Sequence, residues 1–188
     1  TVAVLTSRNE RGARIVEELK RNNLPYVELL QSSQSTRYTA DILAACLRSL
    51  ADPGSTSKLQ DVIKRLGRIA SGDDKSTADI YRGAVSVLER CQRLEEYLAP
   101  YPDADWLAGL PDDLLSDGVR QVLLTSREKI VRWQKASLLP VDQLLLTISQ
   151  ELFSNPSALA LAHKLALLLE RAAGNHPAGN GGIFAPLR

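Results

Sequence analysis

The pattern of apolar residues changes once along this chain, near residue 31, and that change constrains the fold more than any other feature. Before it, apolar runs at residues 2–5 and 24–30 flank helical spacing over residues 8–23, which predicts a strand, a helix and a second strand. After it, apolar residues recur every three or four positions, as in helices. A lone β-α-β unit buries too little surface to be stable without further strands. We therefore expect either that the two strands form a stub attached to a helical body, or that the chain was cut from a larger protein.

The predicted fold is mainly α-helical, with a β-α-β stub over residues 1–31 and a bundle-like body of about six helices over residues 38–173. The polar residues 31–36 predict a linker. The residues from Ile80 to Leu98 predict the longest helix, ended by Pro100. Asn155 and Pro156 predict the cap and first turn of the last helix. Residues 174–188, rich in Gly, Pro and Asn, predict a disordered tail or a severed connection.

Composition excludes several classes of function. The net charge of +1 gives no strong field toward nucleic acid or membrane, so DNA binding would have to rest on local patches. No stretch approaches the ~18 uninterrupted apolar residues of a membrane span and no signal peptide is visible, which predicts a cytoplasmic protein without a membrane partner. Cys46 and Cys91 occupy apolar helical positions, which predicts buried free thiols in a reducing compartment. Thr1 at the start and the lack of methionine favour an excised piece.

The sequence shows no complete catalytic or metal site. A Gly-rich phosphate loop ending in Lys-Ser/Thr is missing. His163 and His176 have no second ligand at metal spacing, and His163 is expected at the surface. Asp112 and Asp113 resemble an acid pair, but in a loop they are more typical of helix caps. We therefore expect no catalytic residue, no metal and no bound cofactor in this chain alone.

The N-terminal residues resemble a known motif. Residues 2–10, then Glu17-Glu18-Leu19, then Leu24-Pro25-Tyr26 are similar to motif IV of UvrD/Rep-type superfamily 1 DNA helicases. The likeness continues through Asp41-Ile42-Leu43, Leu47-Arg48 and Ala51-Asp52-Pro53, which look like the first helix of the family's accessory 2B subdomain, and covers about residues 1–66. Residues 139–148 are similar to a segment of relatives with divergent 2B regions. The resemblance implies that residues 1–31 begin the RecA-like domain 2A and that the 2B insertion follows.

The resemblance also implies a function. The parent protein would be an ATP-dependent DNA helicase of the repair or replication class that uses ATP and Mg and acts on a junction of duplex and single strand. This fragment would be a non-catalytic region for duplex contact and regulation. The alternative is a stand-alone helical protein–protein interaction domain without nucleotide chemistry. Exposed strand edges of the stub could promote an artificial dimer.

The family's nucleotide contacts point to Arg8 and Asn9, on the phosphate side of the ATP site in the intact protein only. The family commonly has an aromatic residue where Thr6 stands and a phosphate-contacting arginine where Ser7 stands, so Arg8 is displaced by one position. The alternative is that Arg8 simply begins the helix and Asn9 caps it.

The DNA contacts implied by the resemblance are Lys64, Arg65 and Arg68, where relatives have a Lys-Arg-Gly-x-Gly turn before a duplex-binding hairpin. One glycine of that pattern, Gly67, remains. The alternative is a basic helix end that interacts favourably with its own helix dipole. A second basic cluster is expected to be solvated surface and consists of Arg127, Lys129, Arg132 and Lys135.

Overall fold

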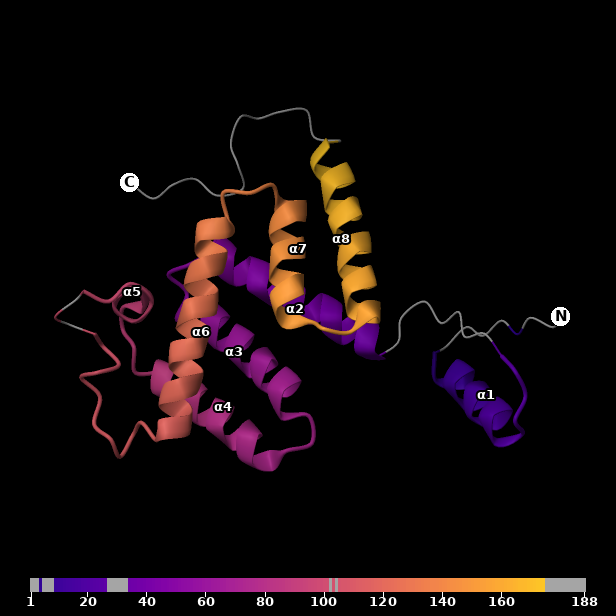
Figure 1. The fold of residues 1–188 in the computed structure, drawn as a ribbon, viewed down its shortest axis with the longest axis horizontal. Coiled ribbons are helices and arrows are strands. Elements are labelled where there is room, and N and C mark those ends of the chain that lie inside the picture. Colours follow the sequence, from indigo (N-terminus) through magenta and orange to yellow (C-terminus); the bar gives the residue numbers. More distant parts are fainter. Residues whose placement is uncertain (1–3, 5–8, 27–33, 102, 104, 175–188) are drawn as a thin grey trace. The chain divides into compact units, whose positions relative to one another are not determined.

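The computed structural model describes residues 4, 9–26, 34–101, 103 and 105–174. Within these residues the chain is mainly α-helical and contains no strand (Figure 1), which confirms the mainly helical part of the prediction but not the β-α-β stub. The helices are α1 (Asn9–Arg21), α2 (Gln34–Ala51), α3 (Thr56–Ser71), α4 (Lys75–Leu88), α5 (Leu94–Leu98), α6 (Asp117–Ala136), α7 (Val141–Leu152) and α8 (Pro156–Gly174). Most of the two predicted strands lies outside the described residues; Val4 and residues 24–26, which are described, belong to no regular element.

The chain divides into two compact units, Thr1–Tyr38 and Thr39–Arg188. The helices of the second unit pack around one apolar core. Helices α3 and α4 pack as one pair and α7 and α8 as another, while α6 contacts α4, α5 and α7. The largest fully buried side chains are those of Trp133, Tyr97, Ile42, Leu43, Leu59, Ile63, Leu88, Leu107, Leu123, Ile130, Leu144 and Ile148. Ile69, near the end of α3, is 37 % exposed.

Local capping explains several helix ends. The Asp74 carboxylate accepts hydrogen bonds from the backbone N–H groups of Ser76 (3.0 Å) and Thr77 (3.2 Å) and so caps α4. Asn155 Oδ1 accepts from the N–H of Ala158 at 2.7 Å, which confirms the predicted cap of α8. Gly72, with φ +50°, follows the last residue of α3 in a backbone conformation that side chains rarely adopt.

Part of the predicted linker is helical, because α2 begins at Gln34 and not near Thr39. The first turn of a helix has no intrahelical partner for its N–H groups, so polar residues can occupy it without an apolar period. The buried face of α2 begins at Thr39, which is 3 % exposed. The periodicity therefore marked the start of the buried face, not the start of the helix.

The predicted long helix from Ile80 to Leu98 is wrong, because the chain breaks into α4 and α5. Cys91 lies in the break, where its buried thiol donates to the carbonyl of Arg93 at 3.2 Å. After the break, the hydroxyl of Tyr97 donates to the carbonyl of Leu123 in α6 at 2.7 Å. Leu94, Tyr97 and Leu98, which share one face of α5, are all buried in the core. The longest described helix is α6, with 20 residues.

Helices α3 and α4 approach closely at Gly67. A Cβ atom added there would lie 2.8 Å from Cβ and 2.9 Å from Cγ of Tyr81. These atoms belong to the stem of the tyrosine and cannot swing away as a flexible chain end would. Gly67 therefore lets the half-buried Tyr81 lie directly on α3.

Candidate functional site

The three cations predicted to bind DNA share helix α3 but lie in different environments. Lys64 and Arg68 are exposed, and their spacing of four residues places them on one face of the helix. The side chain of Arg65 is only 16 % exposed. Its Nη1 lies 2.9 Å from Asp41 Oδ2 of α2, and its Nη2 lies 3.1 Å from Asp61 Oδ2 of α3. Phosphate would have to compete with two carboxylates for Arg65, whereas Lys64 and Arg68 point to solvent.

The pairing of Arg65 belongs to a small charge network between α2 and α3. Asp61 also lies 3.9 Å from Arg48 Nη2, so two arginines share this carboxylate. A guanidinium bound by two carboxylates is held in a fixed position and ties the two helices together. This position gives Arg65 a structural role, and its predicted DNA contact remains a prediction.

The exposed cations of α3 lie on either side of a closely packed glycine in the sequence. Lys64 precedes Gly67 by three residues and Arg68 follows it directly, while Tyr81 of α4 packs on Gly67. Burial raises the pKa of Tyr81. The two exposed cations Lys64 and Arg68 are together called the α3 basic face below. Their positive charges suit phosphate oxygens.

The second basic cluster is not uniformly solvated surface. Arg127 is 12 % exposed, and its two terminal nitrogens lie 2.7 and 2.8 Å from the carboxylate of Asp105. The guanidinium carbon also lies 5.1 Å from the centroid of the Tyr97 ring. Hydrogen bonds from Arg127 hold the pKa of Asp105 below its usual range. The expectation for Arg127 was wrong because its partner comes from a loop 22 residues earlier, a contact that helical spacing does not reveal.

The other members of that cluster behave differently. Lys135 is exposed and Lys129 is half-buried. Arg132 Nε lies 3.5 Å from Glu151 Oε1 of α7, whose other oxygen accepts from the indole N–H of Trp133 at 3.1 Å. These contacts join α6 to α7.

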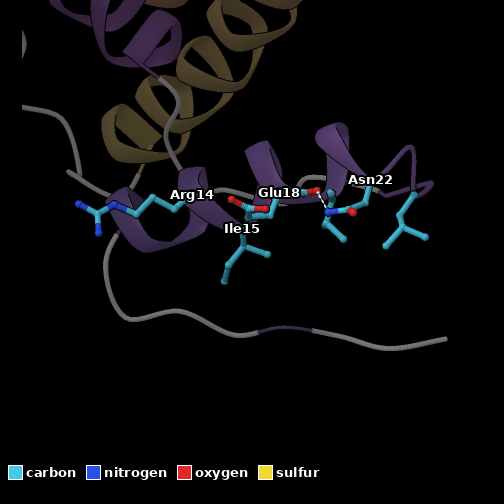
Figure 2. A pocket seen from close by; sticks show the side chains of 6 residues that line it. Arg14, Ile15, Glu18 and Asn22 are labelled. Atoms are coloured by element: carbon cyan, nitrogen blue, oxygen red, sulfur yellow. Dashed lines mark hydrogen bonds between the residues drawn. The ribbon is translucent and has the colours of Figure 1, made fainter.

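The nucleotide residues implied by the resemblance can be located only in part. Arg8 lies outside the described residues, and Asn9 is the first residue of α1. Helix α1 carries a shallow groove lined by Ile15, Leu19 and Leu24, with Arg14, Glu18 and Asn22 at its edges (Figure 2). Asn22 Nδ2 donates to the carbonyl of Glu18 at 2.8 Å. The groove floor is apolar and suits packing more than phosphate binding.

The remaining candidate groups show no reactive arrangement in the described part of the chain. Cys46 and Cys91 are buried free thiols, as predicted, and burial raises the pKa of Cys46 to about 12. His163 is exposed on α8. Asp112 pairs with Arg120 at 3.3 Å and does not cap α6, whose N-cap is Ser116. Among the described residues no three His, Cys, Asp or Glu side chains are grouped so as to hold a metal ion.

None of the described helices has both the length and the apolar character needed to cross a bilayer. Comparison of the chain with protein-family models, with curated proteins and with solved structures finds no match.

Proposed function

We propose that this chain is a fragment of a UvrD/Rep-type ATP-dependent DNA helicase, in which it serves as a non-catalytic region for duplex contact and regulation. The observation that carries the proposal is the resemblance to motif IV and to the start of the 2B subdomain over about residues 1–66. Helix α1 supports it, because it begins at Asn9, the residue after Arg8 in the sequence, and ends at Arg21, before Leu24-Pro25-Tyr26. In this proposal residues 2–5 and 24–30 are strands of a RecA-like sheet.

The proposal assigns ATP and Mg to the parent protein and not to the fragment. Arg8 and Asn9 would lie on the phosphate side of the nucleotide. A phosphoryl-transfer site also needs a phosphate-binding loop and metal ligands, which the sequence of this chain lacks. The gene provides the test: a phosphate-loop sequence upstream and motif V downstream are expected in the same reading frame. A reading frame confined to these residues would contradict the proposal.

DNA contact is proposed at the α3 basic face. Among the described residues neither Lys64 nor Arg68 has a carboxylate within ion-pair distance, so both charges are free for phosphate. Cations that bind DNA phosphates release counterions, so the affinity falls as the salt concentration rises. The slope of log affinity against log salt is about −0.9 for each phosphate contact. Two contacts should therefore contribute about two to the slope of log affinity against log salt.

The experiment is a titration of a labelled forked DNA with the full 188-residue chain, followed by fluorescence anisotropy at low and moderate salt. The double variant Lys64→Ala/Arg68→Ala should bind more weakly and with a salt slope smaller by about two. The matched control is Lys164→Ala/Arg171→Ala, which removes the same charge from exposed positions of α8. Equal losses in both variants would mean that net charge, and not the α3 basic face, determines binding.

The second candidate is a helical protein–protein interaction domain without nucleotide chemistry. It is favoured by the neighbouring Leu167 and Leu168 of α8, which are 52 % and 58 % exposed. The two functions differ in their surfaces, since DNA would contact α3 and a protein partner would contact α8.

A further inference from the structure

Helix α8 has two chemically different faces. On its inner face Ala158, Ala162 and Ala166 are buried in the core, and partly buried leucines pack against it: Leu159, Leu165 and Leu169. Helix α7 is the neighbour against which α8 packs (Figure 1). The opposite face is exposed at positions three and four apart, which places them in one stripe along the helix: Ala160, His163, Lys164, Leu167, Leu168 and Arg171.

The centre of this stripe is apolar. Leu167 and Leu168 are adjacent, and each exposes more than half of its surface. A single exposed leucine is common on protein surfaces and needs no explanation. Leu167 and Leu168 together form an exposed apolar surface of the kind that packs against another helix.

Basic residues flank the leucine pair on this stripe. Lys164 lies one turn before Leu168, and Arg171 lies one turn after Leu167. In the described part of the chain neither cation is within ion-pair distance of a carboxylate, unlike Arg65, Arg120, Arg127 and Arg132. Glu170 is the one acidic residue of α8, and it stands beside the stripe. The leucine pair is therefore framed by two unneutralised positive charges.

This charge pattern distinguishes between possible occupants. A second copy of the chain, packed through the same face, would place cations against cations, which opposes a symmetric dimer. Residues 175–188 follow α8 directly but contain no Asp or Glu, so their side chains cannot neutralise the framing charges. An amphipathic helix with an apolar stripe and acidic flanks satisfies both the leucines and the cations.

We propose that the outer face of α8 is a docking surface for an acidic amphipathic helix of a partner protein. Apolar side chains of that helix contact Leu167 and Leu168, and its carboxylates pair with Lys164 and Arg171. Flanking charge pairs of this kind select the partner and its orientation in helix pairs. The proposal goes beyond the DNA contact at α3, and neither depends on the other because they use different helices.

The test uses a defined probe. A fluorescein-labelled helical peptide of about 16 residues carries leucines in a single stripe with glutamates on both flanks, and its matched peptide carries lysine at each glutamate position. With the full chain, the acidic peptide should bind with a dissociation constant at least about tenfold lower than that of the basic peptide. Higher salt should weaken this preference, because the framing charges are exposed.

Three variants locate the binding. The variant Leu167→Gln/Leu168→Gln should lose at least about tenfold in affinity for the acidic peptide. The variant Lys164→Glu/Arg171→Glu should reverse the preference toward the basic peptide. The control Leu138→Gln removes a leucine that is 94 % exposed in the turn after α6 and should leave binding unchanged. Far-ultraviolet circular dichroism confirms that each variant keeps its helix content, which surface changes at these positions should preserve.

Several results would overturn the proposal. One is equal binding of the acidic and basic peptides, or no binding of either. Another is a charge-reversal variant that keeps the original preference. Self-association in sedimentation that disappears in Leu167→Gln/Leu168→Gln would show that a second copy occupies the face. Stronger peptide binding after deletion of residues 175–188 would show that the C-terminal residues occupy it instead.

Discussion

Replacing Arg127 by methionine tests what holds the loop before α6 against the helical core. In the structure Arg127 binds the carboxylate of Asp105 through two hydrogen bonds of 2.7 and 2.8 Å and lies over the ring of Tyr97. Tyr97 in turn packs edge-on against Trp106 of that loop, with ring centroids 6.2 Å apart. Methionine keeps much of the apolar stem, so the change removes chiefly the charge and its hydrogen bonds.

The expected loss in free energy of unfolding can be estimated from the exposure of the two side chains. Exposed ion pairs contribute up to about 1 kcal/mol, whereas removing one partner of a fully buried pair costs about 3–5 kcal/mol. Arg127 is 12 % exposed and Asp105 is 30 % exposed, so we take about 2 kcal/mol for the pair. The contact with Tyr97 adds about 0.5–1 kcal/mol. Arg127→Met should therefore lower the free energy of unfolding by about 2–3 kcal/mol.

The assay is urea denaturation followed by circular dichroism at neutral pH. Urea is uncharged and, unlike guanidinium chloride, does not screen the ion pair. Asp105→Asn and the double variant complete a cycle in which the two changes should be coupled by about 1–2 kcal/mol. The control Arg120→Met removes the pair with Asp112, whose side chain is 97 % exposed, and should change stability by less than about 0.5 kcal/mol.

The pH dependence gives an independent check. Hydrogen bonds from Arg127 lower the pKa of Asp105 in the folded chain, so the folded state binds this proton more weakly than the unfolded state does. The stabilisation is therefore present above the ordinary carboxyl pKa of 3.8 and is lost as pH falls through the lower, folded value. The difference between the native chain and Asp105→Asn should shrink over that acid range. Additive effects in the cycle, together with a difference that does not change with pH, would refute this account of the ion pair.

Two further predictions concern the core. Gly67→Ala places a Cβ 2.8 Å from Cβ of Tyr81 and should lower the free energy of unfolding by about 1–2 kcal/mol, although alanine favours helices. The control Gly54→Ala, where nothing lies within 4 Å of the added Cβ, should change it by less than about 0.5 kcal/mol. Equal urea midpoints for the two variants would contradict the close packing of α3 and α4. Cys46 and Cys91 should not react with a disulfide reagent at pH 8 until the chain unfolds, because both thiols are buried and the pKa of Cys46 is raised to about 12. The pKa of Cys46 is higher in the folded chain than in the unfolded chain. The stability that the neutral thiol contributes is therefore complete below the unfolded value of 9.0 and is lost as pH rises toward 12. Rapid labelling of the native chain at pH 8 would contradict the burial of these thiols.

The described helices after α1 could largely be predicted from the sequence, because the signals that define a helix are local. Apolar residues three and four apart identified the buried faces of α3 and α6, and Asn155 with Pro156 identified the start of α8. The break between α4 and α5 was missed because the apolar spacing continues through Cys91. The hydrogen bond that Tyr97 makes after the break, to the carbonyl of Leu123, spans 26 residues and cannot be read from local spacing.

The candidate site was determined only partly by the sequence. The order of residues placed Lys64, Arg65 and Arg68 together on one helix, but it did not show that Arg65 faces Asp41 of α2 while its neighbours face solvent. It likewise grouped Arg127 with surface cations, although Asp105 and Tyr97 enclose it. The sequence did not show that Leu167 and Leu168 of α8 are exposed. That followed only from the structure, in which the alanines of the same helix are buried in the core.

The sequence by itself therefore determined where most helices form and which side of each is apolar, because backbone hydrogen bonds and side-chain spacing act within a few residues. Only the tertiary structure decided which charges are paired and which are free. A cation's availability depends on the carboxylates and rings that other helices and loops bring to it, and those partners are set by packing over long sequence distances.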